Sequence, residues 1–210
     1  MKKIIIGSAI LSAILCVTFC MAKNIDLPAP DKSGGKSLMT VLETRKSDRT
    51  FSSKELPKQM LSDLMWAAAG RSRNNSDFRT IPTSRNQQEM DVYVFLITGI
   101  YKYDHKTHKL ILFKAGDSRD KTGGQDFAKT APVNIVIVSN FDKIGGDDEY
   151  KAVTAGFHAG AISQNIYLYC ASVGLNTVVR KLLDYEGLAK ILDLKPHQKV
   201  TAAQTVGFAN

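Results

Sequence analysis

The chain has 210 residues, with 28 Lys and Arg against 20 Asp and Glu, which gives a formal net charge of +8 at pH 7. Hydrophobic residues make up 44% and charged residues 23%, and these ordinary proportions exclude wholesale disorder and a fibrous repeat. The length fits one domain with a proper core, and the single long apolar run excludes a polytopic membrane protein. Because compact basic patches with interleaved aromatic residues are absent, we expect no nucleic-acid partner.

The N-terminus has the pattern of an export signal. A short basic start, Met1–Lys3, precedes a nearly continuous run of apolar or small residues from 4 to 19. Cys20 and Ala22 stand three and one positions before a candidate cleavage point, so we predict a signal peptide over residues 1–22. One alternative is a lipoprotein acylated at Cys20, which would contact the membrane only through its lipid. The other is an uncleaved N-terminal anchor. We therefore predict an exported protein, either periplasmic or an outer-membrane lipoprotein.

The cysteine and histidine content limits the chemistry of the mature chain. Without residues 1–22 only Cys170 remains, which cannot form an internal disulfide alone. One cysteine and four scattered histidines cannot build a structural zinc site, and we predict no metal. The sequence also has no nucleophile elbow, Walker A loop or dinucleotide fingerprint. The candidate sites are therefore local polar clusters.

The expected elements follow residues 23–36, which contain proline, glycine and many charges. We interpret this segment as a linker or a leader strand before a domain over 37–210. We predict a helix from Ser37 that continues toward 45–49, a helix between Pro57 and Gly70, a strand over 91–97, a hairpin over 99–113, a strand over 133–138, a long helix over 152–173, a short helix near 188–192 and a strand over 200–208. Helices and strands are mixed without strict βαβ alternation, which indicates the α+β class with a central sheet.

The first candidate site is the segment Arg45-Lys46-Ser47-Asp48-Arg49, which has three cations and a hydroxyl within five residues. Guanidinium groups bind phosphate bidentately, and Ser47 can add a hydrogen bond. The segment either stays helical or loops near the helix end, and in both cases Arg45 and Arg49 can lie on one side. A helical continuation would put them on one face because they are four residues apart. The alternative is a solvated basic helix end, which the helix dipole favours.

The second candidate is the run Pro82-Thr83-Ser84-Arg85-Asn86-Gln87-Gln88, directly before a predicted strand. Its polar side chains could hold the edge of a heteroaromatic ring, which needs several fixed donors and acceptors. A plain polar turn is the alternative.

Taken in order, three motifs resemble those of the nitroreductase family of flavoproteins. Residues 45–51 match the motif Arg-Arg/His-Ser-x-Arg/Lys followed by an aromatic residue, and residues 82–88 match Pro-Ser-Ser/Ala-x-Asn-x-Gln with Thr83 in place of Ser. Gln164-Asn165 and Gly174-Leu175 match a long helix and its exit. The hairpin start at 99–104 and the closing residues 205–208 look like the SagB-type dehydrogenase branch. The likeness extends over residues 37–210.

The resemblance implies a nitroreductase-like α+β fold with a mostly antiparallel sheet flanked by helices, and FMN bound non-covalently at a homodimer interface. By position, the phosphate and ribityl chain would be held by Arg45, Lys46, Ser47 and Arg49. The isoalloxazine ring would lie along four residues of the other subunit: Pro82, Thr83, Ser84 and Asn86. Backbone groups near Val179, Arg180 and Lys181 would also meet the flavin. Many relatives have a further Lys/Arg pair near the C-terminus; this chain lacks it, so Arg45 or Arg180 is expected to contribute more.

The implied function is an FMN-dependent oxidoreductase that acts on a small molecule by ping-pong electron transfer, with no acid or base side chain assigned. NAD(P)H is the candidate electron donor, although it is scarce outside the inner membrane. The alternatives are a SagB-type dehydrogenase acting on a peptide or other small substrate, and a non-catalytic exported flavin-binding protein. A surface-associated binder that has lost the flavin site is disfavoured by the intact sets around Ser47 and Asn86.

Overall fold

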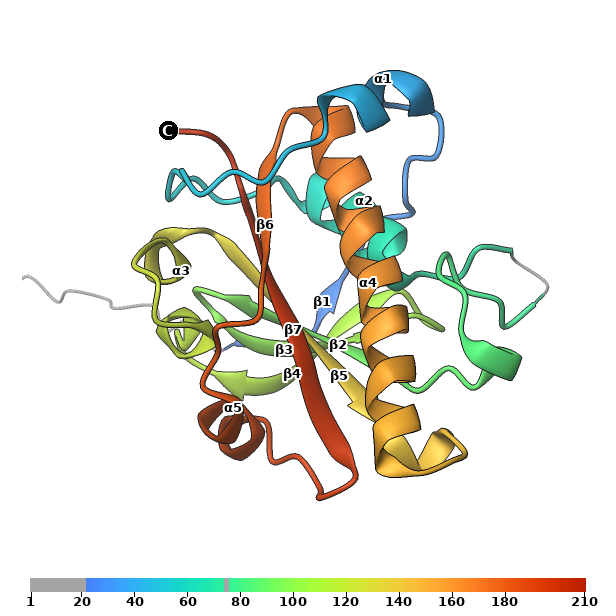
Figure 1. Ribbon diagram of the computed structural model, residues 1–210. Helices are drawn as coiled ribbons and strands as arrows, with labels where there is room; N and C mark the ends of the chain where they lie inside the picture. Colours follow the sequence, from blue (N-terminus) through green and yellow to red (C-terminus); the bar gives the residue numbers. More distant parts are fainter. Residues whose placement is uncertain (1–21, 74–75) are drawn as a thin grey trace, which may run out of the picture.

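A computed structural model describes residues 22–73 and 76–210, and these form an antiparallel sheet of seven strands with helices on both faces (Figure 1). The strand order is β1-β4-β3-β2-β5-β7-β6, and each neighbouring pair is antiparallel. The strands are β1 (Ile25–Asp26), β2 (Met90–Leu96), β3 (Gly99–Asp104), β4 (Lys109–Ala115), β5 (Val133–Asn140), β6 (Asn176–Arg180) and β7 (Gln198–Gly207). The predicted α+β class with a mostly antiparallel sheet is confirmed.

The helices are α1 (Leu38–Thr44), α2 (Lys58–Ala69), α3 (Phe127–Thr130), α4 (Asp148–Val173) and α5 (Tyr185–Ile191), with short 3₁₀ turns η1 (Ser84–Asn86), η2 (Arg119–Thr122) and η3 (Phe141–Lys143). The helix predicted over 152–173 begins earlier, at residue 148. Its first turn is polar and is capped by the side chain of Asp147, which accepts the Tyr150 N–H. Gly174 ends the helix in the left-handed conformation at φ 77°, as a C-terminal glycine commonly does.

The central strands are buried on both faces, which explains their nearly continuous apolar sequences. Val92 and Val94 of β2 pack with α2 and α4, whereas Tyr93 and Phe95, one residue out of phase, pack with Leu188 at α5. This alternation follows from the two-residue period of a strand. The sheet is therefore a rigid middle layer that fixes the position of α4 on one side.

The structure decides between the alternatives that the sequence left open for two segments. Residues 23–36 include a leader strand that lies against the domain, since Ile25 pairs with Leu110 of β4 and the Ser62 hydroxyl donates to the Pro28 carbonyl. Of the two alternatives for the basic cluster, the structure has the loop and not the helical continuation, because α1 ends at Thr44 and Arg45 leaves the helix with ψ 127°. Residues 1–21 of the predicted signal peptide lie outside the described residues.

Within the described part of the chain, no helix combines the length and the apolar character needed to cross a bilayer.

Candidate functional site

The basic segment 45–49 is held in an extended conformation against α4 and β6. Its Asp48 N–H donates to the Thr177 carbonyl at 3.0 Å. The Ser47 hydroxyl lies 2.7 Å from the buried hydroxyl of Tyr167 on α4, and that oxygen also accepts the Val179 N–H at 3.0 Å. Because the phenol can donate to Ser47, the serine can keep its own hydrogen for an external acceptor. Tertiary contacts, rather than a helix, therefore order this segment.

The cations of this segment are available to a ligand to different degrees. The Arg45 guanidinium lies over the ring of Tyr167, 5.0 Å from its centroid, and the side chain is half-buried. Lys46 pairs with Asp48 at 3.1 Å. Hydrogen bonds from the Thr50 hydroxyl and N–H, together with Lys46, lower the pKa of Asp48 to about 2. Among the described residues, neither Arg45 nor the exposed Arg49 has a carboxylate within ion-pair distance. Two guanidinium groups can thus meet an anion.

The loop 82–88 contains the turn η1, and three residues of the loop, Arg85, Asn86 and Gln88, have positive φ angles of 52°, 55° and 48°. Non-glycine residues rarely adopt this left-handed backbone, and clusters of it are found preferentially at functional sites. Inside the turn, the Thr83 hydroxyl accepts the Gln88 N–H at 3.1 Å. Pro82, Ser84 and Asn86 are exposed and Thr83 is half-buried, so a ligand can reach this loop.

The loop is joined to α4 by a buried pair that the sequence did not reveal. His158 of α4 is 2% exposed, and its Nε2 accepts the Ser84 N–H at 3.0 Å and lies 3.1 Å from the Ser84 hydroxyl. Its Nδ1 lies 2.5 Å from Oε1 of Glu89, whose side chain is fully buried. No spacing signal links positions 69 residues apart, and so only the fold brings the two together.

Ser84, His158 and Glu89 have the residue types of a hydrolytic triad but not its hydrogen-bond pattern. A triad histidine keeps its Nε2 lone pair for the serine hydroxyl. Here the backbone N–H of Ser84 already donates to that nitrogen. The cluster is therefore suited to anchoring the loop rather than to activating a nucleophile.

The two candidate segments of one chain lie on opposite sides of α4. His158 and Tyr167 are nine residues apart, which is two and a half turns and about 14 Å along the helix axis. In Figure 1, the segment after α1 passes on the β6 side of α4, and the turn after α2 lies on the other side. One chain alone thus does not bring residues 45–49 and 82–86 together.

The three residues predicted to meet the flavin through their main chain have different environments. The Val179 N–H is engaged by Tyr167. The Arg180 side chain is buried and donates to the Thr122 carbonyl at 2.7 Å and to Oδ1 of Asn134 at 3.0 Å, and burial lowers its pKa to about 10. Its guanidinium is thus occupied inside the protein, and of the two arginines weighed for the phosphate, Arg45 rather than Arg180 is available to a ligand. Lys181 is exposed.

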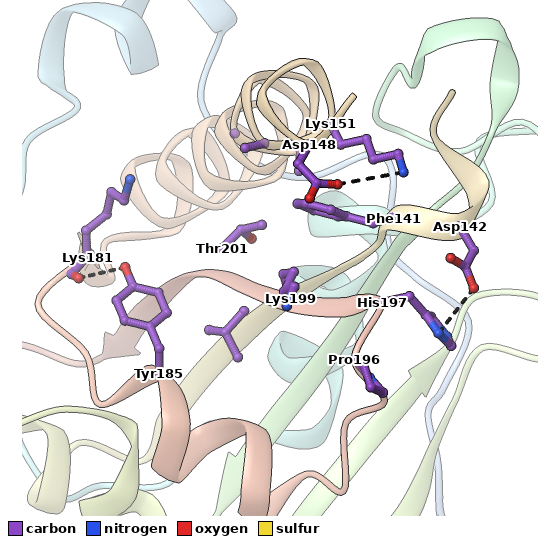
Figure 2. A pocket seen from close by; sticks show the side chains of 14 residues that line it. Phe141, Asp142, Asp148, Lys151, Lys181, Tyr185, Pro196, His197, Lys199 and Thr201 are labelled. Atoms are coloured by element: carbon purple, nitrogen blue, oxygen red, sulfur yellow. Dashed lines mark hydrogen bonds and ion pairs between the residues drawn. The ribbon is translucent and has the colours of Figure 1, made fainter. Parts of the chain in front are cut away.

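Lys181 also lies at a cavity of about 710 Å³ between the first turns of α4, α5 and the start of β7 (Figure 2). Two carboxylates on its wall are paired, Asp142 with His197 at 3.1 Å and Asp148 with Lys151 at 4.0 Å. The ammonium groups of Lys181 and Lys199 have no such partner among the described residues, which gives the wall an excess of positive charge. The cavity could take a small molecule and is adjacent to residues 179–181.

Comparisons of this chain with known proteins agree with one another and extend over most of its length. The sequence model of the Nitroreductase family matches residues 42–208. A protein of Methanocaldococcus jannaschii with the provisional name nitroreductase is 27% identical over 191 residues, which cover 84% of this chain and 94% of that protein. The crystal structure of a Ralstonia eutropha protein, also provisionally named a nitroreductase, is 40% identical and covers 91% of each chain with a TM-score of 0.85.

A more distant structure supports the fold alone. A chain of the E. coli microcin synthetase complex is 18% identical, with a TM-score of 0.68 and coverage of 96% of this chain and 85% of that one.

Proposed function

Since this chain belongs to the nitroreductase family of oxidoreductases, we propose that it binds FMN and transfers electrons between a donor and a small-molecule substrate by a ping-pong mechanism. The observation that carries the proposal is the segment anchored by Tyr167. It presents Ser47 and two guanidinium groups that have no carboxylate partner among the residues that the structure describes. This donor set fits a phosphate of about −1.5 to −2 charge, because charge-assisted bonds from arginine to phosphate are strong and geometrically specific.

A homodimer is part of this proposal. The phosphate segment (residues 45–49) and the ring-edge loop (residues 82–88) of one chain lie on opposite sides of α4, so one chain cannot supply both to the same FMN. The exposed ridge of α4 between them is apolar, with Tyr150 56%, Val153 68% and Phe157 75% exposed. Next on this ridge, a Cβ added at Gly160 would meet no atom of the described residues within 4 Å, so the surface there is open to close helix approach. Pairing α4 with α4 of a second copy would cover the ridge and complete each site with the other chain's loop 82–86.

In the proposed dimer, each set of candidate site residues has a separate role. Arg45, Lys46, Ser47 and Arg49 hold the phosphate end, and the loop residues Pro82, Thr83, Ser84 and Asn86 of the second copy lie along the ring. FMN, when bound, supplies the hydride and electron chemistry, and the protein supplies orientation and electrostatics. We place the substrate in the cavity beside Lys181, whose positive wall favours a molecule with negative charge. NAD(P)H, itself an anion, is the candidate donor.

The finer assignments are also proposals. We infer an exported protein from the pattern of residues 1–22, and this makes the source of the electrons outside the cytoplasm the main biological question. A dehydrogenase of the SagB type that acts on a peptide or other small molecule is the second candidate function. It is favoured by the hairpin start over residues 99–104 and the closing residues 205–208, where the resemblance to that branch lies.

The absorption spectrum of the purified protein, before and after denaturation, tests the proposal. We expect a flavin spectrum, with about one FMN per chain released on denaturation, because flavins in this proposal are held without a covalent bond. Stopped-flow mixing with NADH or NADPH under anaerobic conditions should then bleach the flavin absorbance. A colourless protein that takes up no FMN from solution contradicts the proposed function. A yellow protein that no donor or acceptor oxidises or reduces supports a flavin carrier instead.

A further inference from the structure

The conformation of the loop 82–88 needs an external constraint. With three non-glycine residues in left-handed backbone, the loop persists in this shape only if its surroundings fix it. Two contacts fix its C-terminal end. The side-chain amide of Gln88 donates to the Asp77 carbonyl at 2.7 Å, and the ammonium group of Lys143 donates to the main-chain carbonyl of Gln88 at 3.1 Å. At its centre, the contact from Ser84 to His158 connects the loop to α4.

The geometry of that contact determines the protonation of His158. A backbone N–H can only donate, so His158 Nε2 has to present a lone pair to the Ser84 N–H. The single ring proton is then on Nδ1, which donates to Glu89 Oε1. Glu89 therefore selects the tautomer of His158, and the tautomer supplies the acceptor that Ser84 requires.

We propose that the buried Glu89–His158 pair is a positioning pair for the ring-edge loop, which holds Ser84 and its strained neighbours where the loop contacts its ligand. Neither residue touches the ligand, since both side chains are buried behind the loop. The identity of the ligand as FMN rests on the proposed function, whereas the link from Glu89 through His158 to Ser84 concerns this chain alone.

Four substitutions separate the hydrogen-bond pattern from simple packing. Glu89→Gln keeps an oxygen that can accept from Nδ1, whereas Glu89→Met removes it. His158→Gln puts an acceptor near the place of Nε2, whereas His158→Asn keeps only a donor near the place of Nδ1. The matched control is Asp91→Asn, which changes a carboxylate on β2, two residues after Glu89, that pairs with Lys102.

The first measurement is the ¹⁵N NMR spectrum of histidine-labelled wild-type protein without FMN, with His158 assigned by difference from His158→Gln. We expect Nδ1 to be protonated and Nε2 to be unprotonated. A protonated Nε2 at neutral pH overturns the proposal. This arm needs only the wild-type fold, so it decides the tautomer even where a substitution in the buried pair prevents folding.

The second measurement is limited trypsin cleavage after Arg85, which is exposed in the loop. Loss of a buried hydrogen bond corresponds to a change of roughly 5- to 150-fold in an equilibrium, so we expect Glu89→Met and His158→Asn to accelerate this cleavage by about that factor. Glu89→Gln, His158→Gln and Asp91→Asn should remain near wild type. Cleavage after the exposed Lys106, in the turn between β3 and β4, is the internal reference for global destabilisation. Equal acceleration at both sites, or none, contradicts a positioning role.

The third measurement is FMN affinity by fluorescence titration, where the same rank order is expected over the same range of fold-changes. If the wild type binds no FMN, the proposed function fails, while the tautomer and the cleavage pattern still decide the positioning role. If FMN binds equally to all five variants while Arg85 cleavage changes, the loop is positioned but does not contact FMN, and the proposed use of the pair is wrong.

Discussion

Replacing Arg45 with alanine tests the phosphate site most directly, because Arg45 is the guanidinium whose position the structure fixes, over the ring of Tyr167. Two unit charges about 4 Å apart attract each other by about 1 kcal/mol in bulk water and about 4 kcal/mol at an effective dielectric constant of 20. Since Arg45 is half-buried, we expect a loss between these limits, which is roughly 5-fold to several hundred-fold in FMN affinity. Arg49 is exposed, so Arg49→Ala should be near the lower limit.

The assay compares FMN with riboflavin, which lacks the phosphate. Fluorescence titrations of both ligands against wild type, Arg45→Ala, Arg45→Lys and the exposed-lysine control Lys106→Ala give a double-mutant cycle in which one partner is the phosphate. We expect Arg45→Ala to weaken FMN, to leave riboflavin nearly unchanged and thus to remove most of the preference for FMN. Arg45→Lys should recover part of it, because it restores the charge but not the planar guanidinium.

Two results would refute this reasoning. Equal wild-type affinity for FMN and riboflavin removes the phosphate site altogether. Equal weakening of both ligands in Arg45→Ala, accompanied by a lower melting temperature, shows that the arginine supports the fold through Tyr167 rather than the phosphate.

Three further outcomes are expected. Tyr167→Phe should lower the free energy of unfolding by about 1–3 kcal/mol in chemical denaturation, because the half-buried Val179 N–H and the Ser47 hydroxyl lose their partner; an unchanged value would show that water replaces the phenol. Phe157→Asp should turn a dimer into a monomer in sedimentation velocity experiments and should release FMN, whereas a dimer that survives the substitution places the interface elsewhere. Burial lowers the pKa of His105 to about 4 from its usual 6.5, so the unfolded state binds the proton first as the pH falls. Stability should therefore decline from pH 6.5 to 4, and His105→Gln should flatten that decline in denaturation curves; an identical slope in both proteins would contradict it.

Much of the fold was predictable from local patterns. The strands β2 and β5 are runs of β-branched and aromatic residues, and α4 combines helical spacing of apolar residues with a terminal glycine, so these elements are encoded within short windows. The five-residue strand β6 was not predicted, because Asn176–Arg180 is too short and too polar at its ends to stand out.

The details of the candidate site were less accessible. No glycine or proline occurs between the start of α1 and Arg49, so no local signal decides whether the helix ends before the basic cluster. The cluster is extended because the Asp48 N–H donates to a carbonyl of β6. In the same way, the Arg180 guanidinium donates hydrogen bonds to Thr122 of η2 and to Asn134. These residues are far from Arg180 in the sequence, so no local pattern predicts the contacts. The roles of the site residues toward FMN remain predictions.

The attachment of residues 45–50 to β6 has a consequence for solubility. β6 is the last strand of the sheet, and such a strand exposes unpaired main-chain groups that can recruit a strand from another molecule. On its outer side, the Thr177 carbonyl is covered by the Asp48 N–H and the Val179 N–H by the Tyr167 hydroxyl, and the Asn176 amide holds Thr50. The segment proposed to grip the phosphate thus also shields the sheet from edge-to-edge aggregation. Substitutions that detach it would produce insoluble protein during expression, independently of any effect on cofactor affinity.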